Sequence, residues 1–412
     1  MVMISAIIVS TLAMSAVWAT RKHQLEQTAA DQAYELASAA DSAIELALAR
    51  IAANPKWRNS HVHNTEYGPF TLGDVAIFYR LLDSEGNIGT GRLRDVTVIG
   101  IAKRGTYSYA AQVEVTPAGP ALTFLNHGFS TIYDVDMKYR CTWTNNGSFH
   151  FDDDLRLQHQ ASLSGVVNVV GSLVLDSGSY MNGPTTTSVP KTSFANVETL
   201  NRYIEEATNI SITSLPTVSG RRRIGNCILS PNHNPFGSSL NSKGIYRINC
   251  SGQNIELTNC RILGTLVLQN LGSDSRIFRN VYAQPFIANY PSLYIDGDID
   301  IDTRWGNFSE SLIGTNLNPV GAPYQGSTNS TQNDIYPARI DGLFYTRGEV
   351  WLEYDCELEI DGVFRPWEIT TNSDTSLRIN YNSDIAANPP PGFRQDTIMR
   401  PIQGTYQRVA TP

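Results

Sequence analysis

Four aspartates in the second half of the chain are the first candidates for chemistry. Asp296, Asp298, Asp300 and Asp302 alternate with glycine or isoleucine. Side chains alternate across a strand, so all four carboxylates are predicted to lie on one face. Like charges in a row repel, and the row could therefore bind Ca²⁺ or form part of a β-helix lyase site. The alternative, which carries more weight, is the solvent face of an edge strand. Calcium is the only cofactor that the sequence suggests.

Three consecutive arginines form the second candidate. Arg221, Arg222 and Arg223 could clamp an acidic polysaccharide or a partner's carboxylates. A solvated loop is the alternative and carries more weight. The acidic run 152–154 is open to the same two interpretations, a calcium ligand cluster or, with more weight, a solvated loop.

Motifs of established catalytic families are absent from the sequence. It has no GxSxG, HExxH, P-loop or dinucleotide fingerprint. His233 lies in the turn-forming run Pro-Asn-His-Asn-Pro, and His159 has no evident partner. We therefore predict no catalytic residue.

Composition limits the class of protein. The 412 residues include 31 Lys and Arg and 39 Asp and Glu, which gives a net charge of −8. Nucleic-acid binding needs a basic surface, so no nucleic-acid partner is expected. The 31 glycines and 20 prolines favour a turn-rich β protein. The five cysteines show no CxxC spacing; Cys250 and Cys260 could form a bridge or serve as buried small hydrophobic residues.

The amino-terminal region predicts one long helix. Residues 1–20 have no charged side chain, and twenty helical residues span about 30 Å, enough for a membrane or filament core. Residues 21–58 continue it with an apolar stripe at three- and four-residue steps, and Asn54-Pro55 ends it. Two shorter core helices are the alternative. The residues expected to mediate assembly are Met1, Ile4, Ser5, Ile8, Leu12 and Val17.

Charges near the apolar run bear on topology. A cleaved secretory signal is disfavoured, because no basic residue precedes the run and the helical pattern continues beyond it. Positive charges normally stay on the cytoplasmic side, and here Arg21 and Lys22 follow the run. A basic leader outside this numbering would reconcile export with that rule. We therefore expect that Met1 lies at or near a processed amino terminus, or that the sequence given starts late.

Residues 1–20 and their continuation DQAYELASAADSAIELALARIAANPKWR resemble the amino-terminal helix of bacterial type IV pilin-like proteins. The likeness is to minor pilins and pseudopilins whose head continues into further domains, and it covers residues 1–115. It implies a leader removed by a prepilin peptidase, export, and incorporation into a filament or a membrane-anchored tip complex. Many pilins carry glutamate at the fifth mature position. Ser5 stands there if Met1 is the mature start, as in a minor or tip subunit.

The resemblance also implies partners and location. Other pilin-like subunits would bind through the helix, and the inner membrane would hold the chain before assembly. The destination would be the cell surface or an extracellular filament, where a polysaccharide or a host or neighbouring cell surface could be the ligand.

Short extended runs follow the helix. Residues 75–82, 93–102 and 107–115 are separated by turn residues and predict an antiparallel head over 59–118. The Pro-Ala-Gly-Pro run at 117–120 marks the expected domain boundary, and 119–160 is interpreted as a connector.

Residues 161–400 show a different pattern. Ile-Asp-Gly, an apolar residue and Phe recur in 339–344 and 359–364, with a looser copy at 294–297. Such a period predicts a solenoid of stacked short strands. We predict a right-handed parallel β-helix with insertions at 184–223 and 306–334 and a tail at 401–412; a β-sandwich is the alternative. The fold class is thus α+β followed by all-β.

Two functions follow from these patterns. The first is a non-catalytic pilin-like subunit that displays a β-helical domain at the cell surface for structure or adhesion. The second is an envelope-anchored enzyme that binds or degrades polysaccharide on the same scaffold. The absence of a recognisable acid–base constellation favours the first.

Overall fold

The computed structural model describes residues 2–54, 57–83, 86, 88, 95–195, 197–395 and 398–410, and the side chains of all of these except 2–13, 197 and 198. The chain forms two compact units. The first combines Met1–Gly119 with Gln395–Pro412, and the second is Pro120–Arg394. The second unit is therefore an insertion within the first.

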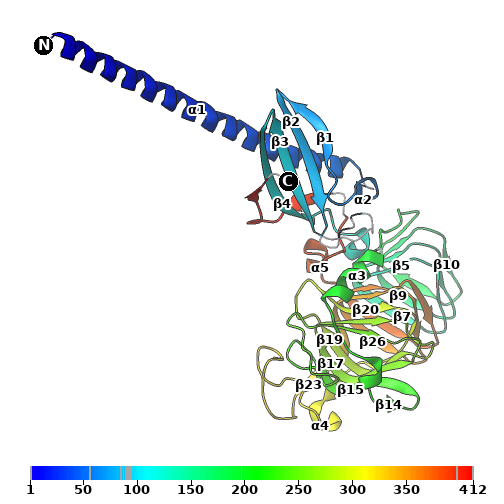
Figure 1. The fold of residues 1–412 in the computed structure, drawn as a ribbon. Helices are drawn as coiled ribbons and strands as arrows, with labels where there is room; N and C mark the ends of the chain where they lie inside the picture. Colours follow the sequence, from blue (N-terminus) through cyan, green and yellow to red (C-terminus); the bar gives the residue numbers. More distant parts are fainter. Residues whose placement is uncertain are drawn as a thin grey trace. The chain divides into compact units, whose positions relative to one another are not determined.

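One long helix begins the first unit. Helix α1 (Val2–Ala53) ends where Asn54 and Pro55 were expected to stop it, and α2 (Trp57–Ser60) follows. Small and branched apolar side chains of its second half, among them Ala40, Ala43 and Ala47, are fully buried. Figure 1 shows this half lying against the sheet while the first half extends away from it. The close approach requires a glycine at position 100, where a Cβ would lie 2.1 Å from the Ala40 carbonyl oxygen.

An antiparallel sheet packs on this helix. Its consecutive strands are β1 (Tyr67–Leu72), β2 (Val75–Leu82), β3 (Val96–Arg104) and β4 (Tyr107–Pro117). In β2 buried and half-buried residues alternate, as expected for a strand with one face on a core. The carboxyl-terminal strands β29 (Met399–Pro401) and β30 (Gln407–Val409) both pair with β4. The expectation of a separate tail at 401–412 is corrected, because β29 and β30 belong to the first unit's sheet.

The second unit is a solenoid of parallel strands, and the fold class predicted from the sequence is confirmed. Most of its strands pair in parallel with strands of neighbouring coils, as β17 does with β15 and β19; β14–β15 and β22–β23 are antiparallel pairs. Inward side chains form one continuous core. The strands from the start of the unit are β5 (Phe129–Thr131), β6 (Val135–Met137), β7 (Thr142–Phe151), β8 (Leu155–Leu157), β9 (Ser162–Val169), β10 (Leu173–Leu175), β11 (Tyr180–Asn182) and β12 (Thr185–Thr187).

The remaining strands and helices of the unit follow after residue 190. The strands are β13 (Thr208–Asn209), β14 (Thr217–Val218), β15 (Arg221–Leu229), β16 (Ile245–Asn249), β17 (Ile255–Leu263), β18 (Thr265–Gln269), β19 (Arg276–Gln284), β20 (Pro291–Asp296), β21 (Ile299–Asp302), β22 (Asn307–Ser309), β23 (Ile335–Pro337), β24 (Arg339–Thr346), β25 (Glu349–Leu352), β26 (Glu357–Arg365), β27 (Glu368–Thr371) and β28 (Ser376–Asn380). The helices are α3 (Val197–Glu206), α4 (Glu310–Ile313) and α5 (Asp384–Ala387).

The coils do not stack in the order of the sequence. The last coil pairs with the first, since β28 aligns with β7 and β26 meets β5 at Phe364 and Phe129. Residues 119–160, expected to be a connector, therefore contain solenoid strands β5 to β8. Their inward side chains, such as Trp143 and Phe149, are fully buried. This burial corrects the expected start of the solenoid at residue 161.

The Ile-Asp-Gly repeat marks a corner of the coil. Gly342 and Gly362 lie side by side in the β24–β26 register and have φ of 86° and 154°. Gly297, in the looser third copy, has φ of 149° and separates β20 from β21. These left-handed conformations favour glycine.

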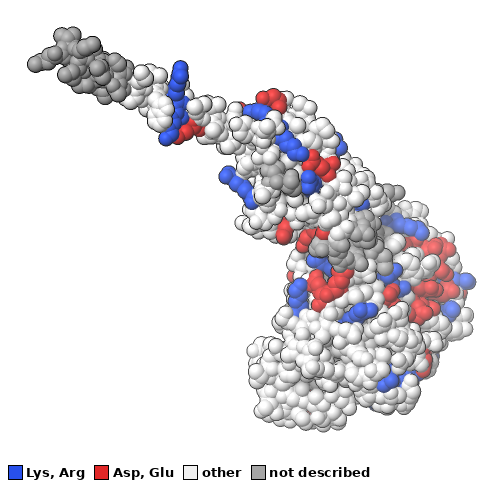
Figure 2. All heavy atoms as spheres, in the orientation of Figure 1, with Lys and Arg blue, Asp and Glu red and all other residues white. Residues whose placement is uncertain are grey.

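The insertions cover the faces of the solenoid. Helix α3 and neighbouring segments bury Leu200, Tyr203 and Phe393 against one face. Segment 306–334, with α4, covers another through Phe308, Leu317 and other apolar residues. Figure 2 shows almost no charge in the region around α4, whereas both signs of charge gather near β10.

Candidate functional site

The described side chains of the first half of α1 are exposed from Met14 to Asp31. Met14, Trp18 and Leu25 follow steps of four and seven residues and so share one helix face. Their exposed fractions are 73%, 67% and 71%. Such an apolar face on a projecting helix suits association with another apolar surface.

Most of the residues expected to mediate assembly lie outside this description. The side chains of Met1, Ile4, Ser5, Ile8 and Leu12 are among those that the structure does not describe, and Val17 is exposed. Among the described residues, no helix is both long enough and apolar enough to span a membrane.

A charged groove of about 340 Å³ lies on the side of the solenoid. Strands β15, β19 and β21 supply four of its lining residues, and the turns at 274 and 353–354 supply the other three. Its lining residues are Arg221, Asp274, Arg276, Asp300, Asp302, Glu353 and Tyr354. The groove brings together one residue of the arginine run and two of the aspartate row, which are about eighty positions apart in the sequence.

Alternating charges line up across successive coils beside this groove. The register places Arg223 next to Glu256, Glu256 next to Arg276, and Arg276 next to Asp300. Glu256 is 1% exposed, and its two oxygens lie 2.7 Å from the Arg223 guanidinium and 2.6 Å from that of Arg276. A buried carboxylate with two cationic partners is well compensated, so this row fixes the positions of both arginines.

The surroundings of Asp300 change its pKa. Burial, followed by the nearby carboxylates of Glu353 and Asp274, raises the pKa of Asp300 to about 6. Asp302 is instead held by Arg304, with an Nη1 to Oδ1 distance of 2.9 Å. The groove thus holds one carboxyl that is protonated in mildly acidic solution beside others with cationic partners.

The four aspartates do not form one row. The corner at Gly297 and Asp298 separates β20 from β21, so Asp296 lies on the other side of it from Asp300 and Asp302, and Asp298 lies in the corner itself. Asp296 pairs with Arg347 at 3.4 Å, and Asp298 accepts a hydrogen bond from the Glu349 amide. Within the described part of the chain, no group of three or more His, Cys, Asp or Glu residues is arranged to hold a metal ion.

The arginine run lies at the start of strand β15 and not in a solvated loop. Arg221 donates to the backbone and carboxylate oxygens of Asp274. Arg222 donates to Gln253 Oε1 and the Leu215 carbonyl oxygen, both at 3.1 Å. The three side chains are half-buried and paired within the solenoid, which corrects the expectation of a solvated loop for this run.

The acidic run and the two histidines considered from the sequence contact other side chains of the solenoid. Asp152, expected to lie in a solvated loop, is buried, with carboxylate oxygens 3.1 Å from His150 Nε2 and 3.3 Å from Arg365 Nη2. His233 lies 3.1 Å from the Ser230 hydroxyl within its turn. His159 stacks on Tyr139. Sequence reasoning missed Arg365 as a partner of Asp152 because it comes from β26, more than two hundred residues further along the chain.

All five cysteines are free and buried, so the bridge considered between Cys250 and Cys260 is not formed. In the ladder Cys260 lies beside Cys227. Burial raises the pKa of the Cys250 thiol to about 12, and the same cause raises that of Cys356 to about 11. These side chains are inert small hydrophobic residues of the core.

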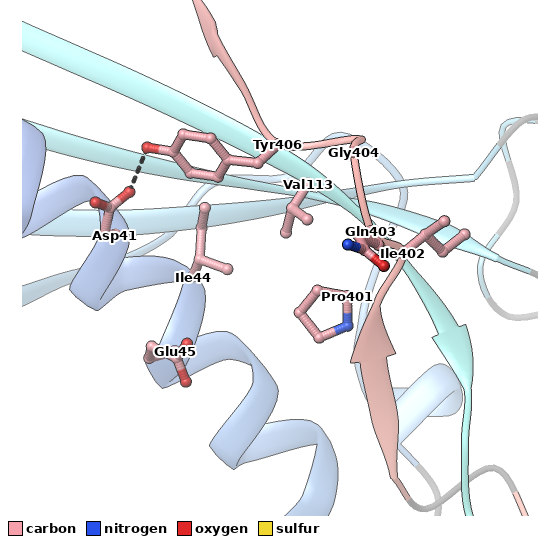
Figure 3. A pocket seen from close by; sticks show the side chains of 9 residues that line it. All are labelled: Asp41, Ile44, Glu45, Val113, Pro401, Ile402, Gln403, Gly404 and Tyr406. Carbon is pink, nitrogen blue, oxygen red and sulfur yellow. Dashed lines mark hydrogen bonds between the residues drawn. The ribbon is translucent and has the colours of Figure 1, made fainter.

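A smaller pocket of about 290 Å³ lies in the first unit between α1 and the carboxyl-terminal segment. Figure 3 shows Ile44, Val113 and Pro401 around it and Tyr406 reaching toward Asp41. The Tyr406 hydroxyl donates to Asp41 Oδ1 at 2.6 Å, and this bond is the first cause that raises the pKa of Tyr406 to about 12. The contact ties residues 401–406 to the helix.

Comparison with known proteins finds structural likenesses, among them a pilin and an ice binding protein. No family model and no curated protein matches the chain. A competence-associated pilin, ComZ, from Thermus thermophilus is similar over 90% of this chain and 96% of its own, with 9% identity and a TM-score of 0.33. An ice binding protein from an Antarctic Biological Consortium is similar over 63% of this chain and 91% of its own, with 10% identity and a TM-score of 0.27.

Proposed function

We propose that the chain is a non-catalytic, pilin-like subunit that assembles through the first half of α1 and displays the solenoid at the cell surface. The observation that carries the proposal is the contrast along one helix. Residues such as Ala40 and Ala47 are buried on the sheet, whereas every described side chain from Met14 to Asp31 is exposed.

A projecting helix of this kind needs a partner. Helices gain most of their stability in water from packing of an apolar face, and the first half of α1 lacks such packing among the described residues. Met14, Trp18 and Leu25 supply a face that another helix could cover. The expected partners are other pilin-like subunits, and the inner membrane before assembly.

The insertion of the solenoid supports a role in display. Both of its chain connections lead into the helix-and-sheet unit, at residues 119–120 and 394–395. The solenoid can therefore vary without altering the assembly helix. In this arrangement the ligand, a polysaccharide or the surface of a host or neighbouring cell, would bind to the solenoid.

Charge placed on the apolar helix face should prevent assembly. We expect Trp18→Asp and Leu25→Asp to remove the chain from sedimented filaments, because a carboxylate is costly in an apolar helix interface. Gln27→Asp, on the opposite face, is the matched control and should co-sediment like the original chain. Normal co-sedimentation of both face variants would contradict the proposal.

A second candidate function is binding and cleavage of an acidic polysaccharide in the charged groove. It is favoured by Asp300, a carboxyl with a pKa of about 6 beside the further carboxyls Asp302 and Glu353. Asp300 and one of these two carboxyls could provide the general acid and the general base for glycoside hydrolysis. Arg221 and Arg276 would bind the sugar carboxylates.

A pH profile tests this second candidate. The acid form of Asp300 is present below its pKa, so release of reducing ends should fall as pH rises through about 6. Asp300→Asn should abolish turnover, whereas Asp296→Asn, from the same sequence row but outside the groove, should retain it. Absence of any product from acidic polysaccharides, or equal activity in the two variants, would exclude this function.

A further inference from the structure

One end of the solenoid presents three strand edges. The end coil, residues 170–190, contains β10, β11 and β12. Strand β10 pairs with β8, and β11 and β12 pair with the two halves of β9 on either side of Gly165. Among the described strands, no other pairs with these three. Their outer backbone groups are therefore available to a further strand.

The end coil lacks the features that normally protect an edge. Val174, Leu175 and Tyr180 are 43%, 47% and 59% exposed. Between residues 172 and 190 the sequence has a single charged residue, Asp176. Natural edge strands are usually blocked by charges, by bulges or by a covering segment. Here apolar side chains accompany the unpaired edges.

The opposite end of the solenoid is covered. Strand β14 pairs with the start of β15, and β13 pairs with β16. The segment that carries these strands buries Ile210, Ile212 and Leu215 in the core, at 2%, 8% and 1% exposure. A terminal repeat usually needs such a cap. The contrast indicates that the open end is covered by another molecule.

We propose that the open end pairs with the same end of a second copy of the chain. A two-fold axis perpendicular to the solenoid axis sets two end coils face to face with their strands antiparallel. One edge then pairs with its own copy and the other two pair with each other. A single extended peptide would satisfy only one of the three edges.

The size of the surface agrees with such a pairing. The end coil has 21 residues, from 170 to 190. A standard protein interface uses about 20–30 residues on each side. Three unpaired edges are matched by another set of three unpaired edges. The other end of the solenoid is covered in the described chain, so the matching set is the same end of a second copy.

The pairing would give the displayed solenoid a function. If the chain is a filament subunit, as proposed above, solenoids on different filaments or cells would join end to end. This consequence rests on the proposed function, but the pairing itself does not. The interaction would be homotypic adhesion between copies of the same protein.

Cysteine cross-linking of the full chain in mild detergent tests the pairing. Val174→Cys, Met181→Cys and Thr186→Cys place one thiol at the middle of each edge, and the five native thiols are buried. Residues facing each other across an antiparallel pair lie close enough for a disulfide. At least one variant should give a disulfide-linked dimer on mild oxidation. Arg156→Cys, one coil further in and beside Val174, is the control and should stay monomeric.

A charge variant completes the test. Val174→Lys and Thr186→Lys are added to the dimer-forming cysteine variant at whichever of these two positions does not carry the cysteine. These lysines should abolish the dimer, while an unchanged melting temperature of the solenoid shows that the fold is intact. Adding Leu25→Asp should leave the dimer unchanged, which separates this pairing from helix assembly. No dimer from any of the three cysteines, or as much dimer from Arg156→Cys, would overturn the proposal.

Discussion

Replacing Gly362 with alanine should lower the stability of the solenoid by about 3 kcal/mol or more. Gly362 has φ of 154°, and a Cβ there would lie 2.0 Å from the carbonyl oxygen of Gly342 in the neighbouring coil. The obstacle is backbone of the parallel ladder, so relief would require the two coils to separate. The loss should appear as a lower midpoint for unfolding of the solenoid in urea.

Gly252→Ala provides the matched control for Gly362→Ala. Gly252 also has a positive φ, of 77°, but no atom lies within 4 Å of the position that a Cβ would take. Its substitution should cost about 1 kcal/mol, from backbone conformation alone. Equal losses for the two variants would show that the corner glycines do not control how closely the coils stack.

Replacing Arg261 with methionine should cost about 3 kcal/mol or more and release the segment that covers β15, β17 and β19. The buried guanidinium donates to the carbonyl oxygens of Leu317, Ala322 and Pro323 at 2.8, 2.9 and 2.6 Å. Methionine fills a similar volume but leaves these three acceptors without their donor. Limited proteolysis should then cut within residues 306–334, together with a lower unfolding midpoint.

Arg156→Met is the control for Arg261→Met. The Arg156 side chain is 50% exposed and lies 3.7 Å from Asp176, so its loss should change stability by no more than about 0.5 kcal/mol. Resistance of residues 306–334 to protease in the Arg261 variant would mean that apolar contacts alone hold this segment.

The sequence was sufficient for elements whose signals are local. The apolar stripe and Asn54-Pro55 predicted the extent and the end of α1. The run 75–82 coincides with β2, and alternation in 107–115 indicated β4. The Ile-Asp-Gly repeat predicted neighbouring coils because the corner of each coil needs the same conformation, and β24 and β26 align in that register.

Long-range pairing was not accessible from the sequence. Trp143 aligns with Leu377, and no local pattern marks residues so far apart as neighbours. The return of β29 and β30 to β4 depends on a similar contact between distant segments. The coils at 129–157 were overlooked because β5, β6 and β8 have only three residues each and the turns between the strands are rich in aspartate. Tertiary pairing, which decides such cases, lies outside local propensity.

The charged groove could be predicted only in part. The aspartate row and the arginine run named three of its residues, Arg221, Asp300 and Asp302. The alternation of aspartate with glycine or isoleucine did not reveal the corner at Gly297, which separates Asp296 from Asp300. Glu256 and Arg276, which order the groove, stand in no motif and reach it only through the parallel register.

Protection of position 25 tests the proposed assembly most directly. Leu25→Cys introduces an exposed thiol into a chain whose own cysteines are buried, and Leu312→Cys provides a control at a residue that is 86% exposed. In the isolated, detergent-dispersed chain a maleimide should label both positions. In the native assembly it should label position 312 and leave position 25 unmodified. Equal labelling of position 25 in both states would show that this helix is not the surface through which the subunits join.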